Sequence, residues 1–147
     1  MATFQFTQNV SEQDRKISAA LGVDGANPLG DNDVGKCVSL AASNNYVLAS
    51  DGDDIQGFLH GIESYTVNNG YGFGTVQTNG RLEVEVAAAE VGTVDPGDEV
   101  ICGIQVAVGT AGNPMVKLGT GTTFKWRCIR IITGTGAAGD TVLIERV

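Results

Sequence analysis

The chain has 147 residues, of which 42% are hydrophobic and 18% charged, and this composition excludes a disordered chain. Its 21 glycines are scattered without a period, which excludes collagen-like and low-complexity chains. The net charge of −8 argues against a stand-alone nucleic-acid-binding protein, and no apolar run approaches the roughly 20 residues needed to cross a bilayer. We therefore expect neither nucleic acid nor a membrane as a partner.

The charge is unevenly distributed along the chain. Residues 24–99 carry 13 acidic side chains against Lys36 and Arg81, which gives a net charge of −11. Residues 100–147 carry five basic side chains against two acidic ones, which gives +3. Such a split bears on association rather than on fold, because it can orient a protein on a charged partner.

The first ten residues alternate Phe4 and Phe6 with polar neighbours, and they are too few to form a core. In an extended chain the two rings point the same way, so this segment is predicted to be an arm whose aromatic side chains contact a partner. The alternative is a first strand that packs on the protein's own sheet.

A short helix is predicted over residues 12–21. Ser11 opens a capping sequence, and Ile17, Ala20 and Leu21 follow the spacing of one helix face. Gly22 is placed to end the helix. Residues 23–33 are rich in turn formers and are predicted to be a loop. Residues 1–33 thus form an arm, a short helix and a loop ahead of a β domain at 34–147.

From Val34 onward the pattern is that of β-strands. Residues 34–40 and 45–50 form a predicted hairpin around residues 43–45, and further strands are expected at 55–63 and 71–78. Asn79-Gly80 is the strongest hairpin signal in the chain, and it predicts that 71–78 pairs with 81–87. The strand at 81–87 alternates charged and apolar residues, which indicates one buried face.

The second half of the chain continues in the same way. Asp95-Pro96-Gly97-Asp98 fits a type II turn, and the apolar run 99–108 is predicted to be a strand buried on both faces. In 124–132 the apolar alternation slips near Cys128, which predicts a β-bulge. Lys125 and Arg127 share the face opposite Trp126. The fold class is therefore all-β, an antiparallel β-sandwich or barrel, jelly-roll-like, with an N-terminal arm and one short helix.

The residue types that carry catalysis do not gather in recognisable patterns. His60 is the single histidine and is interpreted as a surface or structurally bonded side chain, with a Cys–His pairing as the weaker alternative. The three cysteines, Cys37, Cys102 and Cys128, lie in apolar runs and form no C-x-x-C pair, so each is expected to be a small buried hydrophobe. Glu83 and Glu85 are interpreted as a solvated strand face.

The acidic clusters are interpreted as solvated turns rather than metal sites. A calcium loop opening at Asp51 would need Gly at its sixth position and Glu at its twelfth, where the chain has Gln56 and Ile62. Asp24, Asp31 and Asp33 lie in a Gly/Pro/Asn loop and receive the same interpretation. We expect no catalytic, cofactor-binding or metal-binding residues, and no enzymatic activity.

Three stretches occur in a characteristic order: V-G-K-C-V-S-L at 34–40, A-S-D-G-D-D-I-Q-G-F at 49–58 and V-D-P-G-D-E-V at 94–100. In this succession the chain from residue 34 to 147 resembles the small β-rich decoration, or cement, proteins of tailed-phage capsids. Each stretch is short and made largely of turn residues, so the likeness lies in their order and spacing. Residues 1–33 lie outside it.

The resemblance implies a structural virion protein that is assembled in the host cytoplasm and ends on the outer capsid surface. It implies binding to the major capsid protein across joints between coat subunits, as a dimer or trimer. The candidate partner-contact residues are Phe4, Phe6, Lys125 and Arg127. The alternative is a carbohydrate-binding or adhesive β-sandwich module, against which stand an aromatic content of 6% and a single tryptophan. A small hydrolase is a third, weaker possibility.

Overall fold

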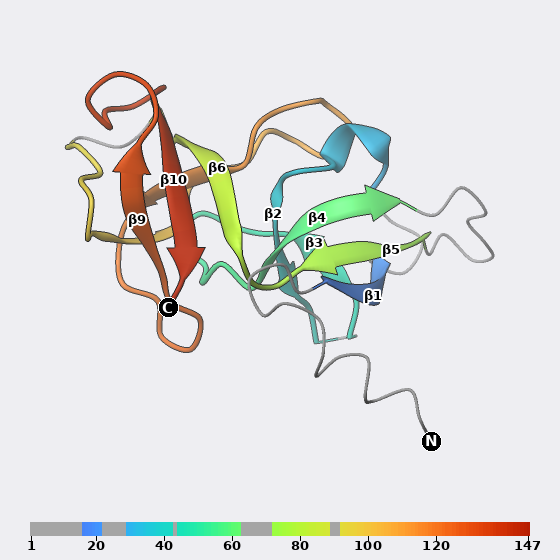
Figure 1. Cartoon of the computed structure of the whole chain (residues 1–147). Helices are drawn as coiled ribbons and strands as arrows, with labels where there is room; N and C mark the ends of the chain where they lie inside the picture. The colour runs from blue at the N-terminus through green and yellow to red at the C-terminus, as the bar shows by residue number, and fades with distance from the viewer. Residues whose placement is uncertain (1–15, 22–28, 43, 63–71, 89–91) are drawn as a thin grey trace.

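A computed structural model describes residues 16–21, 29–42, 44–62, 72–88 and 92–147 of the chain. Regular structure in these residues is β apart from one 3-10 turn, η2 (Asp31–Asp33), so the all-β prediction is confirmed (Figure 1). In the described part of the chain no helix is long and apolar enough to span a membrane. The strands are β1 (Lys16–Leu21), β2 (Cys37–Leu40), β3 (Tyr46–Leu48), β4 (Gly57–Ile62), β5 (Gly72–Gln77), β6 (Arg81–Val86), β7 (Glu99–Cys102), β8 (Met115–Leu118), β9 (Trp126–Ile131) and β10 (Thr141–Arg146).

The strands close into two five-stranded barrels, one built from each half of the chain (Figure 1). In the first barrel, β3, β2, β4 and β5 form an antiparallel sheet in that order. Strand β1 runs antiparallel to β5 and closes the ring against β3 through one parallel pair, Leu21 with Tyr46. The second barrel follows the order β10, β6, β8, β7, β9, in which β6 and β8 are parallel and the other neighbours antiparallel. Every strand in the described residues has a partner on both sides.

The helix predicted over residues 12–21 is wrong where the structure describes it, because Lys16–Leu21 is strand β1. All six residues pair with β5, from Lys16 opposite Gln77 to Leu21 opposite Gly72. A helix of ten residues is not stable by itself in water. Pairing with β5 instead gives the backbone groups of this segment hydrogen-bond partners. Residues 12–15 lie outside the described residues, as does the predicted end of the helix at Gly22.

The hairpin predicted at Asn79-Gly80 is also wrong, although the turn forms. Gly80 has a φ of +103° and donates its N–H to the Asn79 side chain at 2.9 Å, so the local chemistry is that of a tight turn. The flanking strands do not pair with each other, because β5 is taken by β1 and β4, and β6 by β10 and β8. This turn instead carries the chain from the first barrel to the second.

Other local predictions are confirmed. Strands β2 and β3 form the expected hairpin. The Asp95–Asp98 turn closes with a 3.0 Å backbone hydrogen bond, and Gly97 has the φ of +100° that a type II turn requires. The bulge near Cys128 is present, because Leu143 pairs with Arg130 and the next residue of β10 pairs with Cys128, which leaves one extra residue on β9.

The strand predicted over 99–108 is wrong in length and in burial. Strand β7 ends at Cys102, and its residues alternate between buried and half-buried rather than being buried on both faces. Ile104 lies beyond the strand with 61% of its surface exposed. The chain leaves the sheet here because residues 103–114 form a loop that crosses to the first barrel, as its hydrogen bonds to Asp33 and Lys36 show.

The larger hydrophobic core is shared by the two barrels. Cys37, Ile55 and Phe58 from the first half pack with Trp126 and Val142 from the second half in one buried cluster. The rings of Phe58 and Trp126 meet edge to face, with centroids 5.2 Å apart, and the Trp126 indole donates to the Ile55 carbonyl at 2.9 Å. Because buried side chains from the two halves pack in one cluster, we expect the two barrels to fold as one unit.

Candidate functional site

A fully buried ion pair joins the two barrels. The Lys36 ammonium donates to the Asp33 carboxylate at 2.7 Å and to the carbonyls of Ala107 and Thr110 at 3.0 and 2.6 Å. Both side chains have no exposed surface. Asp33 also accepts the N–H of Gly109 at 3.0 Å, so the pair holds the loop of the second barrel against the segment that precedes β2. All three ammonium protons have acceptors, which is the condition for a buried charge to be tolerated.

The interpretation of Asp33 as a solvated turn residue is therefore wrong. Its side chain is buried, and burial by itself raises the pKa of a carboxyl group. The N–H of Gly30, the Lys36 ammonium and the N–H of Gly109 outweigh this effect, and the pKa of Asp33 lies below its ordinary value. The carboxylate stays ionised as part of the fold. Asp31 is exposed, as expected, and Asp24 lies outside the described residues.

Asp54 makes a second joint between the barrels. Its carboxylate accepts the backbone N–H groups of three successive residues, Thr122 at 2.9 Å, Thr123 at 2.7 Å and Phe124 at 3.1 Å. Burial raises the pKa of Asp54, but these three hydrogen bonds, led by that of Thr123, lower it further than burial raises it. The acidic turn at 51–54 thus fixes the loop that leads into β9.

We expect Asp54→Ala to lower the free energy of unfolding by about 1–3 kcal/mol, because three N–H groups lose a charged acceptor. Urea unfolding followed by circular dichroism measures the change. Asp51→Ala in the same turn is the control, since Asp51 forms a partly exposed ion pair with Lys117 and should cost under about 1 kcal/mol. Equal losses in the two variants would contradict the role of Asp54.

The outward face of the second barrel carries a charge ladder, the row Arg81, Glu145, Arg127 and Glu99 on neighbouring strands β6, β10, β9 and β7. Glu145 accepts from Arg81 at 3.1 Å and from Arg127 at 3.2 Å, while Lys125 approaches Glu99 at 4.0 Å. The hydrogen bond from Arg127 lowers the pKa of Glu145; burial raises it, and Arg81 lowers it again, leaving it below its ordinary value. Opposite charges on adjacent strands support the pairing register.

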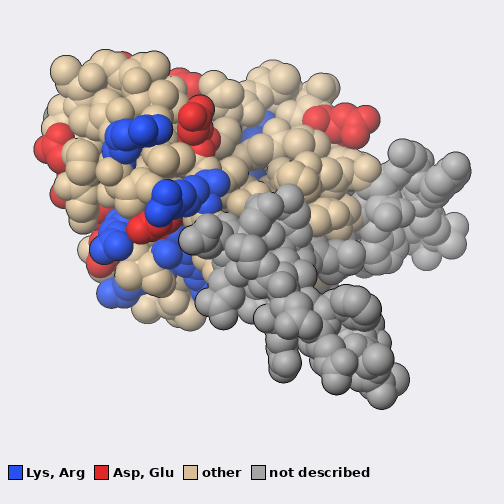
Figure 2. Space-filling model, in the orientation of Figure 1, with Lys and Arg blue, Asp and Glu red and all other residues tan. Residues whose placement is uncertain are grey.

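The structure brings Lys125 and Arg127, two of the candidate partner-contact residues, to this ladder. Their side chains are 46% and 49% exposed. Arg146 lies close by, with its guanidinium 4.9 Å from the Phe124 ring centroid. Figure 2 shows basic side chains gathered, with acidic ones between them, over the lower end of the face formed by β9 and β10. This end can therefore attract an acidic partner while its ion pairs keep the basic side chains in place.

The other residues singled out in the sequence lie elsewhere or outside the described part of the chain. Phe4 and Phe6 lie outside the described residues. His60 is exposed on β4. Within the ranges that the structure describes, no three His, Cys, Asp or Glu side chains are placed to hold a metal ion.

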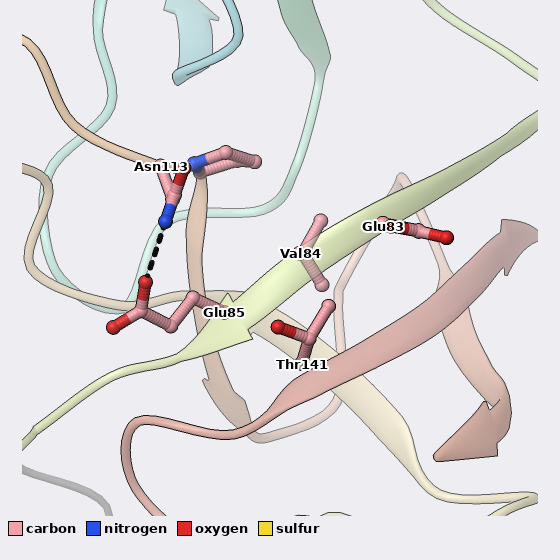
Figure 3. A pocket seen from close by; sticks show the side chains of 6 residues that line it. Glu83, Val84, Glu85, Asn113 and Thr141 are labelled. Carbon is pink, nitrogen blue, oxygen red and sulfur yellow. Dashed lines mark hydrogen bonds between the residues drawn. The ribbon is translucent and has the colours of Figure 1, made fainter. Parts of the chain in front are cut away.

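A hollow of about 200 Å³ lies beside β6, and it includes the two glutamates considered in the sequence. The Glu85 carboxylate accepts a hydrogen bond from the Asn113 amide at 2.8 Å, whereas the Glu83 carboxylate points away from them (Figure 3). The two acids are thus separated rather than paired for acid–base chemistry. The residues that line the hollow are Glu83, Val84, Glu85, Asn113, Pro114 and Thr141.

Comparison of the chain with family models, curated proteins and solved structures finds no match. The ladder and the two joints are therefore interpreted from their own geometry. Sequence reasoning missed Asp33, Lys36 and Asp54 as joints. The available signal was the single lysine at position 36 inside an otherwise acidic and apolar stretch.

Proposed function

We propose that this chain is a non-enzymatic structural protein that binds the outer surface of a tailed-phage capsid and stabilises contacts between coat subunits. One observation supports the proposal above the others. The stretches behind the resemblance contain residues that build the connected barrels: Lys36 in the first, Asp54 in the second and the Asp95–Asp98 turn in the third. The three stretches are thus parts of one folded framework rather than unrelated turns.

The proposed contact surface is the basic end of the second barrel, with Lys125 and Arg127, together with the aromatic residues Phe4 and Phe6. Partly exposed charges of this kind steer encounter and set orientation more than they add affinity. The proposed partner is the major capsid protein, the proposed assembly is a dimer or trimer, and the proposed location is the virion surface after assembly in the host cytoplasm.

The test is to mix the purified protein with emptied capsids that lack it, prepared from the phage that encodes the chain. We expect saturable binding at a fixed number of copies per coat subunit, and a higher melting temperature of the shell, because a ligand that binds only the assembled state stabilises it. Capsids that neither take up the protein nor gain stability at saturating concentration would overturn the proposal.

Lys125→Gln should weaken capsid binding by roughly fivefold and reduce its salt dependence, because a partly exposed charge contributes up to about 1 kcal/mol. Sedimentation of protein with capsids at two salt concentrations measures both effects. Lys117→Gln is the matched control, since Lys117 lies on β8 and pairs with Asp51. A similar loss in both variants would show that net charge, rather than the end with Lys125, governs binding.

The alternative, a carbohydrate-binding or adhesive module, loses its best candidate platform. Trp126 is fully buried and packs against Phe58, so its ring is not available to stack on a sugar. Binding to a glycan array in the absence of binding to capsids would nevertheless favour that function.

A further inference from the structure

Two cysteines from different barrels meet in the shared core. Cys37 lies on β2 and Cys102 on β7, and neither has exposed surface. The Cys37 thiol donates to the Met115 carbonyl at 3.6 Å. The same carbonyl accepts the N–H of Gly103, the residue after Cys102, at 3.0 Å. The Cys37 sulfur therefore lies against the backbone that carries Cys102.

The surrounding hydrogen bonds fix both residues to one segment, residues 49–53. Ala49 donates to the Cys37 carbonyl at 3.1 Å, while Cys102 donates to the Asp53 carbonyl at 2.9 Å and accepts from Gly52 at 2.9 Å. Burial raises the pKa of the Cys37 thiol, and the Cys102 thiol beside it raises that pKa further. The two side chains are thus neighbours: the Cys37 sulfur lies beside the backbone of Gly103, both cysteines are hydrogen-bonded to residues 49–53, and the Cys102 thiol raises the pKa of Cys37.

We infer that Cys37 and Cys102 form an oxidisable dithiol that closes to a disulfide across the two barrels. A peroxide supplies the oxidising equivalents. One thiol is oxidised to a sulfenic acid with release of one water, and the other thiol then attacks that sulfur and releases a second water. In sum, two thiols and one hydrogen peroxide give one disulfide and two waters.

Cys128 is the internal comparison for this site. It is also buried, but it lies on β9 and its thiol donates to the carbonyl of Arg130, two residues along the chain, at 3.7 Å. It therefore makes a local contact in the second barrel rather than one between barrels. Burial of all three thiols means that oxidation requires transient opening, so the reaction should be slow and should quicken when the joint between the barrels is weakened.

The inference does not depend on the capsid proposal and is tested on the full chain. The folded protein is incubated with hydrogen peroxide, then unfolded in an excess of N-ethylmaleimide and analysed by intact mass. We expect the oxidised form to carry one maleimide and the untreated protein to carry three. Trypsin cleaves after Lys36, Arg81, Lys117 and Arg127, so each cysteine falls in a different peptide. We expect peptide 37–81 to be linked to peptide 82–117, and the linkage to vanish on reduction.

Two variants complete the test. Cys128→Ala should keep the linkage, and Cys102→Ala should abolish it and leave Cys37 free to be alkylated. The peptide map of the unsubstituted protein decides the matter even if Cys102→Ala fails to fold. Linkage through Cys128, linkage between two chains, or three alkylated thiols after prolonged oxidation of the folded protein would each overturn the inference.

Discussion

Replacing Lys36 by methionine should lower the free energy of unfolding by about 3–5 kcal/mol, the usual loss when one partner of a buried ion pair is removed. The Asp33 carboxylate would remain buried without its cation, and the carbonyls of Ala107 and Thr110 would lose their donor. The joint between the barrels would then weaken. Chemical unfolding monitored by circular dichroism measures the loss as a lower denaturant midpoint.

Lys117→Met is the matched control, because the same substitution at an ion pair that is 26% and 44% exposed should cost under about 1 kcal/mol. Equal losses of unfolding free energy in Lys36→Met and Lys117→Met would contradict the role of the Lys36–Asp33 pair in joining the barrels.

The buried pair also predicts a pH dependence of stability. Since the folded-state pKa of Asp33 is depressed, the contribution of Asp33 to stability is fully present above the ordinary value of 3.8 and is lost as the pH falls through the lower folded value. Asp33→Asn should remove this acid-sensitive part of the stability.

Phe58→Ala should cost about 3–5 kcal/mol, because the ring is 1% exposed and its removal opens a cavity against Trp126. The chain should still unfold in one step. Trp126 is the single tryptophan and lies in the second barrel, whereas circular dichroism reports on both barrels. The midpoints from fluorescence and from circular dichroism should therefore fall together.

The control for this substitution is Phe124→Ala, which removes a half-buried ring that lies under the Arg146 guanidinium. It should lower the free energy of unfolding by about 1 kcal/mol. An unchanged fluorescence midpoint in Phe58→Ala, with a split transition by circular dichroism, would show that the barrels unfold independently. In that case the shared core would not couple them.

Features fixed by neighbours in the chain were predictable. The alternation of β6, the type II turn at Asp95–Asp98 and the bulge near Cys128 all follow from patterns a few residues long. The same holds for the outward direction of Lys125 and Arg127, since side chains alternate across a strand. The local geometry of Asn79-Gly80 was also predictable.

Features that depend on distant partners were not predictable in this way. A tight turn does not reveal that the strands beside Asn79-Gly80 already have other partners. The spacing of apolar residues in Lys16–Leu21 fits a helix, but pairing with β5 makes this segment a strand. From the sequence, Asp33 is interpreted as a solvated loop residue, and the role of Lys36 is missed, because the carbonyls that bind Lys36 come from more than 70 positions away in the sequence. Long-range pairing, rather than propensity, decided these three cases.

The closure of both rings has a consequence for copies of this chain packed at high local concentration. An open sheet edge presents unpaired backbone groups that recruit a strand from the next molecule, which is a route to fibres. All ten described strands have a neighbour on each side, so none of them leaves a whole edge unpaired. Neighbouring copies must then recognise one another through side chains and loops. The seam between β1 and β3 is held by one residue pair, so this is the place where a strand from another copy could pair most easily.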